Sequence, residues 1–239
     1  TTTSNVGSYT ITSAANNLAA TNYNFTYATG TLTVNKATLT VTADNKSKVY
    51  GNTNPSLTYT ITGYKNSDTS LVVTGAPTIS TAAATTSNVG SYTITSAANN
   101  LSATNYQFSY ANGSLTVTPK SLTITANAQS TVYGTVVTTG SGSTLFTSSG
   151  LINSDAVNTV TIATNQSVTT NAGASSITVT PSAAVGTGLS NYSITYNTGA
   201  VTVTPKSLTI TANARSTTYG TVVTTGSGST LFTSSGLIN

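Results

Sequence analysis

The acidic side chains that could perform chemistry in this chain are three aspartates: Asp44, Asp68 and Asp155. The sequence contains no Glu, His or Cys. A serine hydroxyl therefore has no imidazole to activate it, and zinc or iron has no nitrogen or sulfur ligand. General acid–base catalysis needs a group tuned to titrate near the working pH, most often His or Glu. The sequence predicts that the chain is not an enzyme and binds no cofactor.

Two of the aspartates occupy equivalent places, in Asn66-Ser67-Asp68 and Asn153-Ser154-Asp155. An Asp in such a polar triplet favours a turn, because its carboxylate accepts hydrogen bonds from nearby backbone amides. Calcium requires about 6 to 8 oxygen ligands, usually with several carboxylates. We interpret Asp68 and Asp155 as turn residues, and a weak calcium site stays open as the alternative.

Asp44 raises a different possibility, an autocatalytic isopeptide bond between Lys and Asn. Such a bond needs a buried acid beside both partners, and Asp44 is a candidate for that acid. Its counterpart one repeat later is Asn127, which cannot take the same part. The sequence therefore disfavours isopeptide cross-links.

The composition excludes several classes of partner. Only 4% of the residues are charged, and the formal net charge of +4 is spread along the chain without a cationic cluster. We therefore expect no nucleic-acid binding. No apolar run approaches the roughly 18 residues that a membrane span needs, so membrane insertion is not expected either. Without Cys, no disulfide can stabilise the fold.

The chain repeats itself almost without change. Residues 4–18 recur at 87–101, an offset of 83, and residues 119–153 recur at 205–239, an offset of 86. Self-similarity at a fixed period defines the structural unit. A period of this length also argues against a threonine-covered β-solenoid, including an ice-binding one, because solenoid coils repeat every 20 to 30 residues or so.

The repeat predicts four segments. Residues 37–119 and 120–205 are two complete repeats. Residues 1–36 are the C-terminal part of a preceding repeat, and residues 206–239 are the N-terminal part of a following one. Half-repeats would leave apolar strand faces and unpaired edges exposed. We therefore expect this sequence to be a window onto a much longer array.

Within the first complete repeat, apolar and polar residues alternate with the period of half-buried strands. The predicted strand segments are 39–43, 49–51, 57–62, 71–74, 78–80, 92–95, 106–110 and 115–117. Asn112-Gly113 between the last two predicts a β-hairpin. Repeats of about 85 residues with six or seven short strands fit an all-β fold, a tandem array of small Ig-like β-sandwiches.

Each repeat also carries an aromatic triplet near its end. These triplets are Tyr23/Phe25/Tyr27, Tyr106/Phe108/Tyr110 and, with Ile in the middle, Tyr192/Ile194/Tyr196. Large rings at every second position predict core anchors. An exposed platform for stacking sugars is the alternative.

The junction between repeats is short. Leu115 and Val117 lie at odd positions, whereas Leu122 and Ile124 lie at even ones, so the apolar phase slips by one across the junction. Such a slip sends the two sets to opposite faces of one straight strand, which predicts a handover between two cores. We assign the structural junctions to Pro119, Lys120, Pro205 and Lys206.

A Tyr-Gly pair recurs early in every repeat: Tyr50-Gly51, Tyr133-Gly134 and Tyr219-Gly220. Glycine held at a fixed place after an aromatic residue predicts a turn or bulge that only glycine adopts readily. We therefore assign these six residues to structural turns.

These motifs together resemble a known family. The Tyr-Gly pairs, the segment Val89-Gly-Ser-Tyr-Thr-Ile-Thr95 and the segment running from Asn105-Tyr-Gln-Phe to Leu115-Thr-Val117 resemble the MBG repeats of large bacterial surface adhesins, including filamentous-haemagglutinin-like proteins. The resemblance implies an extracellular or cell-surface location and a role as spacer or fibre. It carries over no catalytic or ligand-binding residue.

Three functions follow as hypotheses. The first is a stiff stalk or extracellular fibre for adhesion, whose partners are neighbouring repeats of the same chain. The second is a module that binds host or cell-surface glycans, with Tyr64 and Tyr110 as candidate contacts. The third is a subunit that pairs with other copies through strand edges into filaments or sheets.

Overall fold

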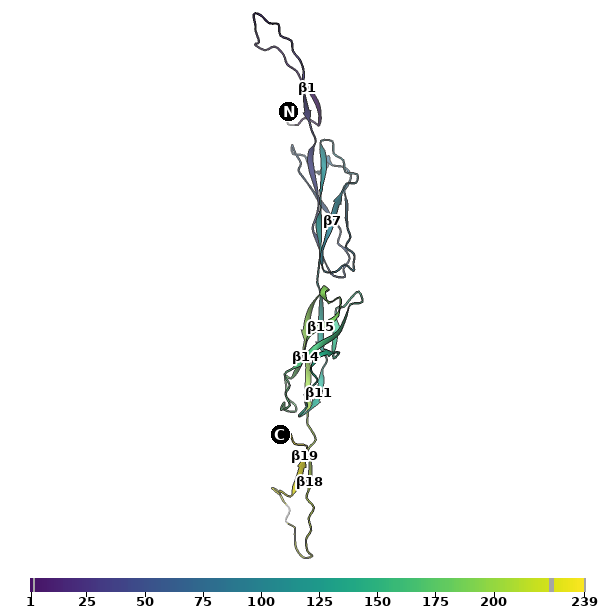
Figure 1. Ribbon diagram of the computed structural model, residues 1–239, viewed down its shortest axis with the longest axis vertical. Coiled ribbons are helices and arrows are strands. Elements are labelled where there is room, and N and C mark those ends of the chain that lie inside the picture. Colours follow the sequence, from purple (N-terminus) through teal and green to yellow (C-terminus); the bar gives the residue numbers. More distant parts are fainter. Residues whose placement is uncertain (2, 224–225, 239) are drawn as a thin grey trace. The chain divides into compact units, whose positions relative to one another are not determined.

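The computed structural model describes residues 1, 3–223 and 226–238. The chain divides into two compact units, Thr1–Lys120 and Ser121–Asn239, which we describe separately (Figure 1). The four predicted segments stay a prediction. Strands dominate both units, and among the described residues no helix is long and apolar enough to cross a membrane.

The first unit begins with a segment in which β1 (Gly7–Ile11) pairs antiparallel with β2 (Gly30–Val34). Seven strands of the complete repeat follow: β3 (Ala37–Ala43), β4 (Lys46–Val49), β5 (Tyr59–Thr62), β6 (Thr78–Thr81), β7 (Gly90–Ala97), β8 (Tyr106–Ala111) and β9 (Gly113–Thr118). They form two sheets, one in the order β5-β3-β8 and one in the order β4-β9-β7-β6.

The two sheets face each other across an apolar core. Ala43 of β3 packs with Ile94 of β7 and Leu115 of β9, and all three are almost fully buried. Leu39 and Tyr106 form a second cluster toward the other end of β3. Alternate residues of each strand point inward, as the period-two pattern predicted. The predicted all-β sandwich fold is therefore confirmed.

The predicted hairpin at Asn112-Gly113 is wrong, because β8 and β9 lie in different sheets. β8 pairs in parallel with β3, and β9 pairs in parallel with β4. Neither Asn112 nor Gly113 has the positive φ that a hairpin turn of type I′ needs. Instead the Asn112 side chain accepts a hydrogen bond from the Ser96 amide (3.2 Å). A side chain at Gly113 would collide with the Ala43 carbonyl, so Gly113 lets the chain cross between sheets.

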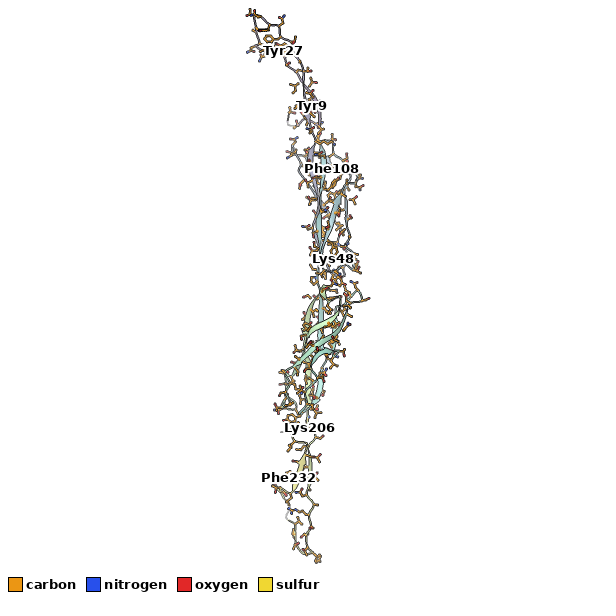
Figure 2. The ribbon with its side chains drawn as sticks, viewed as in Figure 1. Tyr9, Tyr27, Lys48, Phe108, Lys206 and Phe232 are labelled. Carbon is orange, nitrogen blue, oxygen red and sulfur yellow. The ribbon has the colours of Figure 1, made fainter. Side chains whose placement is uncertain are left out.

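Three further strand or core assignments differ. Residues 70–72 form a 3₁₀ turn, η1 (Ser70–Val72), where the alternation predicted a strand, and the Leu71 side chain is 91% exposed. The segment 49–51 is the end of β4 followed by a turn. The rings of Tyr23, Phe25 and Tyr27 are exposed and not core. Figure 2 shows Tyr27 in the loop beyond β1. The strands described before Ala37 are β1 and β2, and neither is a counterpart of β3 against which this triplet could pack.

The second unit builds the same sandwich from eight strands. They are β10 (Lys120–Ala126), β11 (Gln129–Val132), β12 (Gly140–Ser143), β13 (Phe146–Ser149), β14 (Ala156–Thr164), β15 (Thr178–Thr187), β16 (Tyr192–Asn197) and β17 (Gly199–Thr204), with a 3₁₀ turn η2 (Leu189–Asn191) before β16. The sheets have the orders β13-β10-β16 and β11-β17-β15-β14-β12. β14 and β15 lie side by side (Figure 1).

The core of this repeat follows the first. Leu122 and Ile124 of β10 are fully buried, as are Val160 and Val179 of the larger sheet. The aromatic triplets of both complete repeats contribute one buried ring each, Tyr106 and Tyr192, and their other members are half-buried. A last pair, β18 (Thr209–Ala212) and β19 (Phe232–Ser235), lies near the C-terminus.

Candidate functional site at the repeat junctions

Asp68 closes a tight turn and is fastened to a core tyrosine. Asn66 and Ser67 both have positive φ (55° and 64°), and the Asp68 amide donates to the Lys65 carbonyl (2.8 Å), which together define a type I′ turn. The Tyr106 hydroxyl donates to the Asp68 carboxylate (2.7 Å), and it accepts from the Lys65 amide (2.9 Å). This hydrogen bond, together with burial, raises the pKa of Tyr106 above its ordinary value.

The second repeat reproduces this arrangement. Asn153 and Ser154 have φ of 54° and 64°, and the Asp155 amide donates to the Ile152 carbonyl (2.9 Å). The Tyr192 hydroxyl donates to the Asp155 carboxylate (2.7 Å) and accepts from the Ile152 amide (3.0 Å). Each aspartate therefore ties a turn of one sheet edge to the first ring of the aromatic triplet.

The Tyr-Gly pairs form turns of a second kind. The Asn52 amide donates to the Val49 carbonyl (3.0 Å), and Gly51 has a φ of 84°. A positive φ at the third turn residue alone defines a type II turn, which favours glycine there. Gly134 and Gly220 have φ of 88° and 89°, and the same amide-to-carbonyl bond closes both of their turns.

These turns lie at the exit of each complete repeat. The Tyr50 amide donates to the Thr118 carbonyl, the last residue of β9, and the Tyr133 amide donates to the Thr204 carbonyl, the last residue of β17 (2.9 Å each). The structure therefore places the Tyr-Gly turns next to the prolines assigned to the junctions. Pro119 is the single residue between β9 and β10, and Lys120 begins β10. Pro205 and Lys206 follow β17 directly and precede β18.

One junction between repeats lies inside the first unit, where Asn35 and Lys36 connect β2 to β3. Asn105, directly before β8, fastens this junction. Its side-chain oxygen accepts from the Val6 amide (2.9 Å), and its side-chain nitrogen donates to the Asn5 side chain (2.9 Å). Its backbone carbonyl accepts from the Ala37 amide (3.0 Å). Asn105 thus contacts both the preceding segment and the first strand of its own repeat.

A shallow cleft of about 330 Å³ lies beside this junction. Its walls come from the preceding segment and from the turn of the following repeat, and they include Val6, Val34, Lys65, Asp68 and Asn105. Among the described residues no group of three acidic, His or Cys side chains is arranged to hold a metal ion. One carboxylate in the cleft, already engaged by Tyr106, offers little to a cation.

Asp44 is engaged by hydroxyls and not by a lysine–asparagine pair. The Thr58 and Thr60 hydroxyls donate to its two carboxylate oxygens (2.5 and 2.8 Å). These two hydrogen bonds, with a smaller contribution from Lys46, lower the pKa of Asp44. The buried lysine of this repeat is Lys48, whose ammonium donates to the Asn52 and Ala84 carbonyls (3.0 and 2.6 Å). Figure 2 labels Lys48 in the first unit.

A comparison with protein families decides what these repeats are. The sequence model described as MBG domain (YGX type) matches residues 39–116 and 122–202, together more than half of the chain. The chain belongs to the MBG domain (YGX type) family. The two matches fall on the two complete sandwiches, which confirms the resemblance drawn from the Tyr-Gly motifs. No curated protein matches the chain.

Sequence reasoning missed the residues that bridge elements of the MBG repeats. The sequence assigned no part to Asn105, Lys48 or Gln166, although the side chain of each makes at least one hydrogen bond to a segment distant in sequence. A signal for Asn105 was present, because an Asn directly precedes each aromatic triplet, at Asn22, Asn105 and Asn191. Lys48 and Gln166 carried no such signal, since neither recurs at the equivalent position of the other repeat.

Proposed function

We propose that these MBG repeats form a load-bearing stalk or fibre segment of a longer secreted or cell-surface protein that acts in adhesion. The role is mechanical and not catalytic. In this proposal its partners are the neighbouring repeats of the same chain.

The observation that carries the proposal is the direction of the first and last strands of a repeat. β3 pairs in parallel with β8, from Ala37 opposite Tyr106 to Thr42 opposite Ala111. β4 continues in parallel with β9, from Lys46 opposite Leu115 to Val49 opposite Thr118. The chain enters the repeat at one end of this parallel ribbon and leaves it at the other.

This arrangement determines how tension acts. Pulling residues 37 and 118 apart slides β3–β4 along β8–β9, so the hydrogen bonds of the ribbon carry the load together. Strands that are peeled from one end break their hydrogen bonds one after another. Shear loading raises the barrier to forced unfolding, which is governed by the unfolding rate. The side-chain bonds of Asn105 to Asn5 and Val6 support the proposal further, because they restrict the angle between successive repeats.

Single-molecule stretching of the full chain tests this function. We compare Lys46→Pro in β4 with Ser80→Pro in β6, the two edge strands of one sheet. The Tyr50 amide donates to the Thr118 carbonyl of β9, and because amides alternate in direction along a strand, the Lys46 amide also faces β9. Proline removes one amide donor and stiffens the chain in either strand. We expect Lys46→Pro to lower the unfolding force of the first repeat clearly, and Ser80→Pro to lower it little, because β6 lies outside the parallel ribbon.

Thermal unfolding of both variants serves as the control, so that force is compared at known stability. Equal loss of force in the two variants would contradict shear loading. Small-angle scattering adds a second check: an extended particle supports a stalk, whereas a compact globule overturns it. Ordered filaments or sheets in electron micrographs would instead support lateral self-assembly.

Glycan binding is the second candidate, favoured by an open hollow of about 550 Å³ in the first unit. Its walls include Tyr59, Tyr64 and Asp68, a combination of ring faces and a carboxylate suited to sugars. Tyr64 is half-buried with its ring edge-on to Tyr106 at 6.2 Å, and Tyr59 is more exposed. A glycan array that retains its signals with Tyr59→Ala, or that gives none with the native chain, would reject this candidate.

A further inference from the structure

We propose that the Tyr-Gly turn is the surface on which each MBG repeat docks the following one, and that its glycine leaves the space that a side chain of the next repeat occupies. The inference rests on the proposed stalk function and specifies how successive repeats are held. The partner is a hydrophobic or long-stemmed side chain from the turn region of the next repeat.

The second unit shows such a contact directly. A Cβ built at Gly134 would overlap the Cδ1 atom of Ile238 and lie 3.1 Å from its Cγ1 atom. Ile238 belongs to the segment after β19, and thus to the repeat that follows. The space that any other residue would fill at Gly134 is therefore occupied by the neighbouring repeat.

The first unit has a residue at the position equivalent to Ile238, and that residue also lies at a junction between repeats. Ile238 is equivalent to Ile152, and both correspond to Lys65, the residue before the Asn-Ser-Asp turn. Lys65 lines the junction cleft together with Ser4, Val6 and Val34 of the preceding segment. In both units the residue at this position thus faces the repeat before it. Its side chain varies between Ile and Lys, and the lysine stem is also apolar.

The third Tyr-Gly turn shows the surface without such a neighbour. Among the described residues, nothing lies within 4 Å of a Cβ built at Gly220, and the Tyr219 side chain is 104% exposed. Tyr133 is half-buried by comparison. The two glycines have the same backbone conformation, with φ of 88° and 89°. Two features therefore favour glycine at Gly134, its positive φ and the close approach of Ile238. At Gly220 only the positive φ does so.

The test measures how tightly residues 206–238 are held against residues 120–205 in the full chain. The sequence has no Cys, so spin labels can be attached at Thr180→Cys in β15 and Ser234→Cys in β19, both exposed. Electron–electron double resonance then gives the distribution of distances between them. We expect a narrow distribution for the otherwise native chain and a broad one for Gly134→Ala, because the added methyl group displaces Ile238.

Two further variants separate docking from backbone strain. Gly220→Ala adds the same methyl group at the same φ without a neighbour, and we expect it to leave the distribution narrow. Gly134→Ala combined with Ile238→Val removes the Cδ1 atom that the added methyl group overlaps and keeps an apolar side chain at the contact, and we expect a narrower distribution than with Gly134→Ala alone. Amide hydrogen exchange within residues 120–205 shows that the repeat itself remains folded in each variant.

A Gly134→Ala distribution as narrow as the native one would overturn the docking surface and leave the stalk proposal standing. So would a double variant as broad as Gly134→Ala, because the effect would then come from the turn alone. A distribution that is already broad in the native chain would contradict a stiff junction and the docking surface together. By contrast, a low unfolding force of the native chain in the stretching experiment would contradict the stalk proposal and leave the docking contact at Gly134 untouched.

Discussion

The two complete repeats fasten the segment after the Tyr-Gly turn in opposite ways. In the first repeat, Lys48 donates to the Asn52 and Ala84 carbonyls, and the Asn54 side chain donates to the Ala83 carbonyl (2.6 Å). The side chains thus extend from the Tyr-Gly side to the loop after β6.

In the second repeat, the bonds run from the loop back to the turn. Gln166 follows β14 at the position equivalent to Ala83, and it is 8% exposed. Its side-chain nitrogen donates to the Thr135 carbonyl (2.9 Å), and its side-chain oxygen accepts from the Val137 amide (3.0 Å). Lys48 is replaced by Thr131, and Asn54 by Val137.

This exchange shows which feature the fold requires. Both repeats hold the segment after the Tyr-Gly turn to one loop, the loop after β6 in the first repeat and the loop after β14 in the second. An unpaired backbone group there costs free energy once it is shielded from water. The side chain that forms these hydrogen bonds can come from either segment, from the strand before the turn or from the loop. The Gly-Ser-rich insertion of the second repeat shows similar tolerance, because residues 140–143 become the extra edge strand β12 beside β14.

The largest effect is expected from removing the side-chain hydrogen bonds of Lys48 in the first repeat and of Gln166 in the second. Lys48→Ala leaves carbonyls without an ammonium donor and should lower the free energy of unfolding of the first repeat by about 2 to 3 kcal/mol. Gln166→Ala should cost the second repeat about 1 to 2 kcal/mol, because its bonds involve no charge. Hydrogen exchange followed by mass spectrometry reports each repeat separately. Lys46→Ala, on the same strand as Lys48, is the matched control.

A loss confined to the substituted repeat would support independent fastenings. If Lys48→Ala behaved like Lys46→Ala, the buried ammonium would contribute nothing to stability, and the comparison between the repeats would fail at its first step.

The fastenings also mark the limit of what the sequence predicts. The alternation at Leu39, Val41 and Ala43 located the buried face of β3, because a strand has a strict period of two. The same local rule failed at Asn112-Gly113. A hairpin signal describes only neighbouring residues, whereas the pairing of β8 with β3 joins residues about 70 apart in sequence and buries both strands better. The hydrogen bonds of Lys48 and Gln166 depend on such distant pairings, and neither residue recurs in the other repeat, so the sequence did not predict them.

The next effect concerns the hydrogen bond between a tyrosine and a turn aspartate, which both repeats contain. Tyr106→Phe and Tyr192→Phe each remove a hydroxyl that donates to a turn aspartate at 2.7 Å. We expect each to destabilise its own repeat to a similar degree, below the effect of Lys48→Ala, as measured by the same hydrogen-exchange experiment. Tyr110→Phe, with a half-buried ring of the same triplet, is the control. Unequal losses would mean that the two Asp-Tyr pairs are not equivalent.

The Tyr106 pair also predicts a response to alkali. The pKa of Tyr106 is raised above its ordinary value of 10.0 because the hydroxyl donates to Asp68. A raised pKa contributes stability that is present below the ordinary value and is lost as pH rises through the folded-state value. The first repeat should therefore weaken above about pH 10, and Tyr106→Phe should reduce that dependence. An unchanged alkaline profile in Tyr106→Phe would assign the weakening to other tyrosines.

A smaller effect should come from transferring one fastening into the other repeat. Thr131 is the counterpart of Lys48, so Thr131→Lys in the Gln166→Ala background places an ammonium near the Thr135 carbonyl. We expect partial recovery of the stability lost with Gln166→Ala. Thr131→Leu, which adds an apolar chain without a donor, should give no recovery. Equal recovery by both would show that packing, and not the hydrogen bond, had been restored.

The smallest expected effect is a difference between the two repeats in the stability that each loses at low pH. Hydrogen bonds from Thr58 and Thr60 lower the pKa of Asp44 below its ordinary value of 3.8. A lowered pKa contributes stability that is present above the ordinary value and is lost as pH falls through the folded-state value. The second repeat has Asn127 at this place, which does not titrate, while both repeats share the turn aspartates. Below about pH 4 the first repeat should therefore lose more stability than the second. Asp44→Asn should bring its acid profile, followed by hydrogen exchange, close to that of the second repeat, and a profile that keeps its slope would show that Asp44 is not the group responsible.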